Sequence, residues 1–141
     1  STVNAILHDL PPIAHRLHVI ENNGIKIIDD SYNSNPAGFA KALQFLLDTH
    51  GRPKILVTPG MIELGKLQFE ENFNAAKNAL NICDEIIIVG NTNREAFSKG
   101  LGNFKKAHFV VDMDEAKNVI SKITKPGAVI LFENDLPDQY L

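Results

Sequence analysis

The densest run of polar side chains that could do chemistry lies at residues 29–36, which read Asp-Asp-Ser-Tyr-Asn-Ser-Asn-Pro. It follows the β-branched stretch 25–28, and its Asn35-Pro36 pair has the residue types that begin a helix. Carboxylates at the end of a strand can accept hydrogen bonds from ribose hydroxyls, and amides can bind a base or a peptide backbone. The same residue types are also the best turn and capping residues, so by themselves they favour a turn over a ligand site.

Other reactive residue types give no recognisable catalytic or metal site. The five histidines have neither the H-x-x-x-H nor the H-E-x-x-H spacing of a zinc site. Cys83 falls on the apolar face of a predicted helix and is interpreted as a buried residue that packs in the core, not as a nucleophile. The segment 90–94, Gly-Asn-Thr-Asn-Arg, could bind an anion at a helix N-terminus, although a capped turn is the simpler interpretation. The Lys105-Lys106 pair is interpreted as a solvated edge.

The elements that must position these residues alternate along the chain. Five runs rich in β-branched residues predict strands, at 25–29, 54–58, 85–89, 108–111 and 128–132. Helix-length segments lie between them, at about 36–49, 67–82, 93–101 and 114–123. Residues 17–29 predict a β-hairpin closed by an Asn-Gly turn. In the second helix, Phe69, Phe73, Ala76 and Leu80 recur at helical spacing, which predicts that this face packs on a sheet.

This alternation predicts a three-layer, Rossmann-like α/β domain. We expect a mostly parallel sheet of about five or six strands, helices on both faces and an N-terminal β-hairpin. In such sheets the loops at the carboxyl ends of the strands form the binding crevice. The polar run at 29–36, the turn at 59–65 and the acidic segment 133–138 all lie in such loops.

Composition agrees with one domain and excludes several function classes. The chain has 141 residues, 44% of them hydrophobic, and its net charge of −3 argues against a general nucleic-acid binder. No apolar run approaches the roughly 20 residues that cross a bilayer, so no membrane contact is expected. A single cysteine fits a reducing, cytoplasmic location. Ser1 in place of Met suggests a piece excised from a longer chain, and residues 1–14, with Pro11-Pro12, are interpreted as a linker remnant.

The polar run at 29–36 resembles the opening of the C-terminal domain of the Mur ligases, Asp-Asp-Ser-Tyr-Asn-x-Asn-Pro after an apolar strand. Within that family it is most similar to the UDP-N-acetylmuramoyl-tripeptide:D-alanyl-D-alanine ligase (MurF) branch. Arg16 matches an arginine that members carry soon after the linker, and residues 60–65 look like the branch's Gly-Asp-Met-x-Glu-Leu-Gly turn. The similarity extends to Phe132, and the resemblance assigns residues 15–141 to this domain.

The resemblance implies an ATP-dependent amide-bond ligase of peptidoglycan precursor synthesis. ATP would phosphorylate a carboxylate of a UDP-muramoyl peptide, and the amine of an amino acid or dipeptide would attack the acyl phosphate. The phosphate-binding P-loop and the Mg²⁺ ligands would lie in a central ATPase domain of the same polypeptide, and the nucleotide-sugar site in an N-terminal domain. This sequence contains no G-x-x-x-x-G-K-[ST], so we expect no catalytic or metal-binding residue in it and no activity of the chain alone.

Site residues follow from the resemblance position by position. The expected ATP-binding residues are Arg16, Asp30, Tyr32, Asn33 and Asn35. Asp30 would accept hydrogen bonds from the ribose, Arg16 would donate to a phosphate oxygen, and Asn35 would lie beside the base or cap the helix.

Four further residues are expected to face the substrate: Glu63, Glu133, Asn134 and Asp135. The branch usually carries a Lys-Gly-Ser-Arg-like segment after its last strand, whereas residues 133–138 here read Glu-Asn-Asp-Leu-Pro-Asp. If these acids face the cleft, they would attract an ammonium group and repel a carboxylate. The alternative is that they fold out to solvent, where each would matter little.

Two other function classes compete with the ligase. One is a free-standing module that binds a nucleotide or a peptide without catalysis. The other is a flavodoxin-like receiver, which needs an aspartate at a later strand end and a lysine after the last strand. Thr58 and Phe132-Glu133 occupy those places here, so we set the receiver aside.

Overall fold

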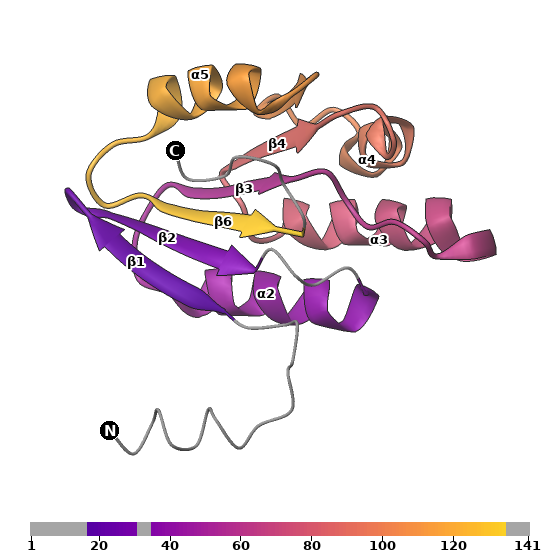
Figure 1. Cartoon of the computed structure of the whole chain (residues 1–141), viewed down its shortest axis with the longest axis horizontal. Helices are drawn as coiled ribbons and strands as arrows, with labels where there is room; N and C mark the ends of the chain where they lie inside the picture. Colours follow the sequence, from indigo (N-terminus) through magenta and orange to yellow (C-terminus); the bar gives the residue numbers. More distant parts are fainter. Residues whose placement is uncertain (1–16, 31–34, 135–141) are drawn as a thin grey trace, which may run out of the picture.

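The computed structural model describes residues 17–30 and 35–134. In this part of the chain a six-stranded sheet lies between helices, as Figure 1 shows. The strands are β1 (His18–Asn22), β2 (Ile25–Asp30), β3 (Lys54–Thr58), β4 (Glu85–Val89), β5 (Ala107–Val110) and β6 (Val129–Glu133). The helices are α2 (Pro36–Asp48), the 3₁₀ turn η1 (Gly65–Leu67), α3 (Gln68–Leu80), α4 (Arg94–Leu101) and α5 (Met113–Ile123). The predicted three-layer fold is confirmed, and the predicted bounds differ from these by no more than two residues.

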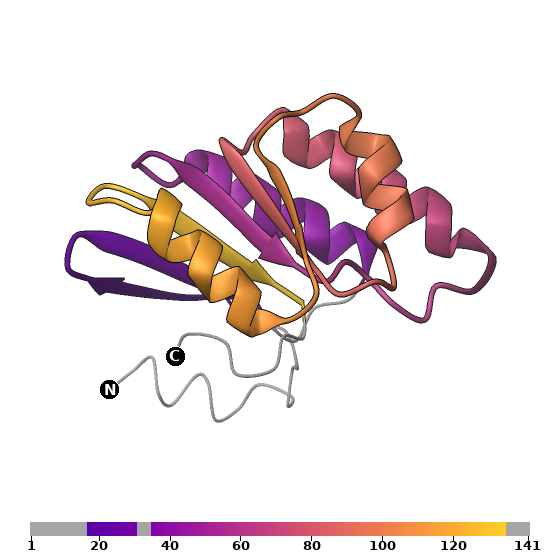
Figure 2. The ribbon, with the colours of Figure 1, turned by 90° about the horizontal axis from the view of Figure 1, so that it is seen from above.

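The strand order β1-β2-β6-β3-β4-β5 explains where each helix lies. The hairpin pair β1–β2 is antiparallel and every other strand pair is parallel. The connections through α2, α3 and α4 all cross the sheet in one direction, whereas α5 leads back to β6, between β2 and β3. Because such crossovers are right-handed, the first three helices cover one face and α5 covers the other (Figure 2).

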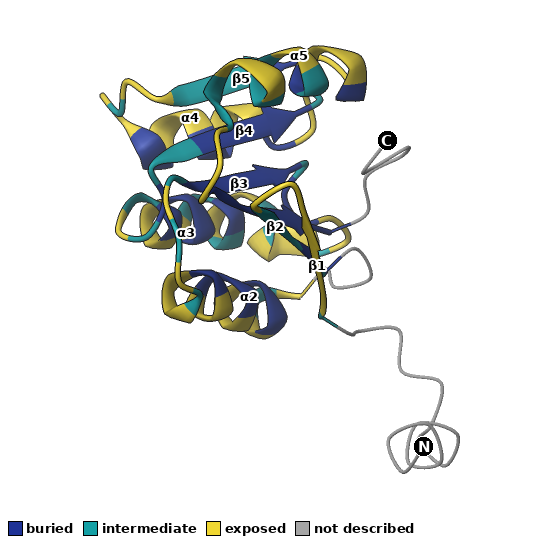
Figure 3. Cartoon of the chain, turned by 90° about the vertical axis from the view of Figure 1, so that its left-hand side faces the viewer, coloured by how far each residue is buried: buried dark blue, intermediate teal, exposed yellow. Residues whose placement is uncertain are grey.

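The core has two layers, one on each side of the sheet. Alternate strand residues such as Ile28, Leu56 and Leu131 pack against α2, α3 and α4. The residues between them, such as Val57 and Ile130, pack against α5. Figure 3 shows β3 buried along its length and β4 buried except at its start, as apolar runs require when both faces are covered. No helix in the described ranges is long and apolar enough to cross a membrane.

Helix α3 buries only part of the face that its spacing predicts: Ala76 is buried and Leu80 packs against the core, whereas Phe69 does not. Phe69 is 44% exposed and stacks on Phe73, with ring centroids 6.2 Å apart, so the predicted placement of Phe69 against the sheet is wrong. The buried residues of α3 are Asn72, Ala75, Ala76 and Ala79. Small side chains are needed there because α4 packs closely: a Cβ on Gly100 would lie 2.6 Å from the Ala76 Cβ.

Candidate functional site

Two acidic residues meet at the carboxyl ends of β2 and β6. Asp30 and Glu133 are register partners across this parallel pair, and both are fully buried. The next residue, Asn134, donates its backbone N–H to the Asp30 carbonyl oxygen at 3.0 Å. Figure 1 shows the ends of β2 and β6 side by side, because β6 inserts next to β2 in the sheet. Residues far apart in the sequence therefore form one buried carboxyl pair.

The environment of this pair changes the charge of Glu133. Burial, and then the neighbouring Asp30 carboxyl, raise the pKa of Glu133 to about 12. Glu133 therefore keeps its proton at neutral pH and can donate a hydrogen bond. It adds no negative charge to this edge of the sheet.

Buried asparagines hold the adjoining loop, residues 59–64, in one conformation. The Met61 N–H donates to Asn72 Oδ1 at 2.8 Å, and Asn93 Nδ2 donates to the carbonyl oxygens of Pro59 and Met61, both at 2.9 Å. Asn134 Nδ2 donates to the carbonyl oxygen of the residue between them, Gly60. The loop is thus fixed by side chains from α3, from the start of α4 and from the end of β6.

Gly60 lies at the centre of this network and has no room for a side chain. Its φ is +84°, and a Cβ there would lie 2.5 Å from Asn93 Nδ2 and 2.7 Å from Asn72 Oδ1. Its N–H donates to Thr58 Oγ1 at 2.9 Å. The Gly60 and Met61 N–H groups are therefore already bonded within the chain, unlike the open amides of a phosphate-binding loop.

Two residues at this edge adopt the left-handed backbone conformation although they are not glycine. Glu63 has φ +63° and is exposed, whereas Asn134 has φ +72° and is buried. Asparagine tolerates this conformation better than glutamate, and such residues concentrate at functional sites because the surrounding structure must hold them there. The surrounding structure therefore holds the turn that carries Glu63 in its unfavourable backbone conformation.

The structure brings some of the residues predicted for the site together. Asp30, Glu133 and Asn134 form one cluster, and Glu63 lies on the loop that Asn134 contacts. Asn35 caps α2, since its Oδ1 accepts from the Gly38 N–H at 2.7 Å; the predicted cap is confirmed. Four predicted site residues lie outside the described residues: Arg16, Tyr32, Asn33 and Asp135. Within the described ranges, no group of three or more His, Cys, Asp or Glu side chains could hold a metal ion.

Sequence reasoning missed the asparagines that shape the edge. Asn93 precedes α4, as a capped turn predicts, but its side chain makes no capping bond and bonds to the 59–61 backbone instead. Asn72 was detectable in principle, because it shares a helical stripe with Ala75, Ala76 and Ala79. A polar residue in a stripe of small buried residues indicates a buried hydrogen-bonding role.

Comparison with known proteins identifies the family. The family model "Mur ligase, glutamate ligase domain" matches residues 15–133. The chain belongs to the Mur ligase family. It is 34% identical over 122 residues to the UDP-N-acetylmuramoyl-tripeptide–D-alanyl-D-alanine ligase of Buchnera aphidicola, covering 83% of this chain and 25% of that protein. It is 30% identical over 132 residues to the UDP-N-acetylmuramoylalanine–D-glutamate ligase of Clostridioides difficile, covering 92% of this chain and 27% of that protein. The chain thus spans about a quarter of the length of these curated relatives.

Solved Mur ligases have the same fold. MurF from Acinetobacter baumannii superposes with a TM-score of 0.74 at 25% identity, over 95% of this chain and 30% of that one. MurF from Thermotoga maritima in complex with ADP gives 0.73 at 25% identity, over 95% of this chain and 32% of that one. The MurF-like resemblance is therefore confirmed, and the chain corresponds to the C-terminal domain of these ligases.

Proposed function

We propose that this chain serves an ATP-dependent amide-bond ligase of peptidoglycan precursor synthesis, which adds an amino acid or a dipeptide to a UDP-muramoyl peptide in the cytoplasm. The family match over residues 15–133 carries this proposal. The likeness to a MurF that was crystallised with ADP supports ATP as the cosubstrate.

The hydrogen bonding of the 59–64 loop supports a division of labour between domains. Its Gly60 and Met61 N–H groups are used internally, and the described residues include no cluster suited to Mg²⁺. We assign the phosphates and Mg²⁺ to a central ATPase domain of the same polypeptide, and the nucleotide sugar to an N-terminal domain. This domain would close over the central one, exclude water from the acyl phosphate and hold the amine in line, which is worth roughly 7–11 kcal/mol of barrier reduction.

For the nucleotide we propose contacts from Asp30 with the ribose and from Arg16 with a phosphate oxygen, with Tyr32, Asn33 and Asn35 nearby. Asp30 is fully buried in this structure, so its contact with a ribose requires a conformation in which its carboxyl is accessible. Its position at the carboxyl edge supports the assignment, because ligands of such sheets bind there.

For the acceptor we propose that Glu63, Glu133, Asn134 and Asp135 lie towards the bound amine. Because Glu133 keeps its proton at neutral pH, its contribution is a neutral hydrogen bond. Any preference for an ammonium over a carboxylate would then rest on the exposed Glu63 and on Asp135. An acceptor with few free carboxylates fits this edge better than D-alanyl-D-alanine.

The test uses the full-length ligase and the chain alone. In the full-length enzyme, Asp30→Ala should raise the ATP KM or lower kcat without unfolding the domain, whereas the exposed control Asp48→Ala should do neither. Calorimetry should show ATP binding to the chain alone at about millimolar Kd or weaker, worth only about 4 kcal/mol. Micromolar binding by the chain alone would instead favour a free-standing nucleotide-binding module.

A further inference from the structure

A polar pocket lies at the amino-terminal edge of the sheet, opposite the edge that carries Asp30 and Glu133. It is a pocket of about 420 Å³ between the starts of β3 and β4, the segment before β5 and the end of α5. Six charged residues line it: Arg52, Asp84, Glu85, Lys106, Lys122 and Lys125. The pocket shares no residue with the Asp30–Glu133 edge, so it is independent of the proposed ligase site.

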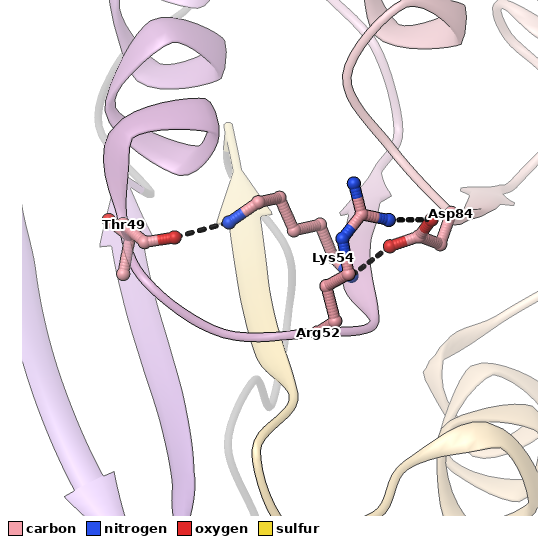
Figure 4. A network of polar contacts seen from close by, with 4 residues as sticks. All are labelled: Thr49, Arg52, Lys54 and Asp84. Atoms are coloured by element: carbon pink, nitrogen blue, oxygen red, sulfur yellow. Dashed lines mark hydrogen bonds and ion pairs between the residues drawn. The ribbon is translucent and has the colours of Figure 1, made fainter.

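The two carboxylates of this pocket are already paired. Asp84 accepts from Arg52 Nη1 at 2.7 Å and from the Lys54 backbone N–H at 2.8 Å, as Figure 4 shows. Glu85 Oε1 lies 2.8 Å from His108 Nε2. Arg52, Asp84 and Glu85 therefore each have a polar partner within the chain.

The three lysines, in contrast, are exposed and take part in neither ion pair found in the described ranges. Lys122 lies in the last turn of α5, where a cation also offsets the helix dipole. That role does not explain Lys106, which comes from a different element, or Lys125, which lies beyond the helix. Beside them, the buried Thr124 hydroxyl finds no hydrogen-bond partner in the part of the chain that the structure describes.

We propose that this pocket binds a phosphorylated small molecule, with Lys106, Lys122 and Lys125 as the ligands of its phosphate oxygens. Three uncommitted ammonium groups from two segments suit a multiply charged oxyanion better than a single carboxylate. The chain as a whole carries a net charge of −3, so general attraction of anions would not bring a ligand here.

Titration with pyrophosphate, followed by amide NMR of the chain, tests this proposal. At low ionic strength the amide signals of Lys106, Thr124 and Lys125 should shift together and saturate, and added salt should weaken the binding. The double variant Lys122→Ala/Lys125→Ala should raise the Kd at least about fivefold, since two of the three cationic ligands are gone. The matched control Lys41→Ala/Lys99→Ala removes two exposed lysines from α2 and α4 and should leave the Kd unchanged.

Three outcomes would overturn the proposal. They are no saturable shift, an equal loss of affinity in both double variants, and shifts that are confined to the Asn35 and Gly60 edge. Because both double variants change only exposed residues, a thermal melt of each establishes that it is folded before binding is compared. Loss of ligase activity in Asp30→Ala bears only on the other site.

Discussion

The buried carboxyl of Glu133 makes a sharp prediction about stability and pH. Its pKa in the folded chain is about 12, against an ordinary value of 4.5. The folded state therefore holds a proton that the unfolded state releases above about pH 4.5. The contribution of this group to stability is complete below the unfolded pKa and is lost as the pH rises towards the folded one. Replacing Glu133 with glutamine keeps a neutral donor of similar shape and removes this titration.

The size of the effect follows from one proton. A proton that is bound in the folded state and released in the unfolded state lowers the free energy of unfolding by about 1.4 kcal/mol per pH unit. This carboxyl therefore lowers the free energy of unfolding by at most about 4 kcal/mol between about pH 5 and pH 8. Glu133→Gln should be close to wild type in stability at the lower pH. It should become progressively more stable than wild type as the pH rises.

Urea unfolding followed by far-ultraviolet circular dichroism suits this chain, which has no tryptophan. Wild type, Glu133→Gln and the exposed control Glu63→Gln are compared at several pH values, and the control should run parallel to wild type. If the Glu133→Gln curve also runs parallel to wild type, Glu133 is ionised in the folded chain. The argument from burial would then fail.

Three further substitutions test the loop network and the helix cap by their urea midpoints. Asn72→Leu should destabilise the chain by about 3 kcal/mol, because the Met61 N–H loses its buried acceptor. Gly60→Ala should cost about 2–4 kcal/mol, since its Cβ would collide with Asn93 at a positive φ; a milder loss would mean that the loop can shift. Asn35→Ala should cost only about 1 kcal/mol, and a neutral result would show that the cap to Gly38 contributes little.

The fold could be predicted because its local signals agree with one another. The strands at 54–58 and 85–89 have the predicted bounds, since apolar runs buried on both faces are bounded by polar residues. The hairpin turn at Asn23-Gly24 was equally predictable from its Asn-Gly pair. In the structure both residues adopt positive φ, as such a turn requires.

The exposure of Phe69 on α3 could not be predicted from apolar spacing alone, although Ala76 and Leu80 of the predicted face do pack inward. Phe69 and Phe73 dominate the hydrophobic pattern, yet the close approach of α4 at Gly100 requires small residues. How closely two helices pack is a property of the assembled layer, so the alanines are buried and Phe69 is left at the surface.

The candidate site was predictable in position and not in chemistry. The rule that ligands bind at the carboxyl ends of parallel strands places Asp30 and Glu133 at one edge. It does not make them neighbours, because that depends on β6 inserting next to β2. This adjacency brings the two carboxyls together. Burial first, and then the Asp30 carboxyl, raise the pKa of Glu133, so a residue that looks anionic in the sequence is neutral in the fold.

The same adjacency links the carboxyl pair to the loop beside it. Asn134 follows Glu133, donates its N–H to the Asp30 carbonyl and donates its side-chain amide to Gly60. It makes both bonds from a left-handed backbone conformation, with φ +72°. Ionisation of Glu133 would place a charge in the covalent neighbour of this link, between two strands that must stay in register. Ionisation of Glu133 is therefore expected to weaken the bond from Asn134 to the loop, while the bonds from Asn72 and Asn93 still hold it.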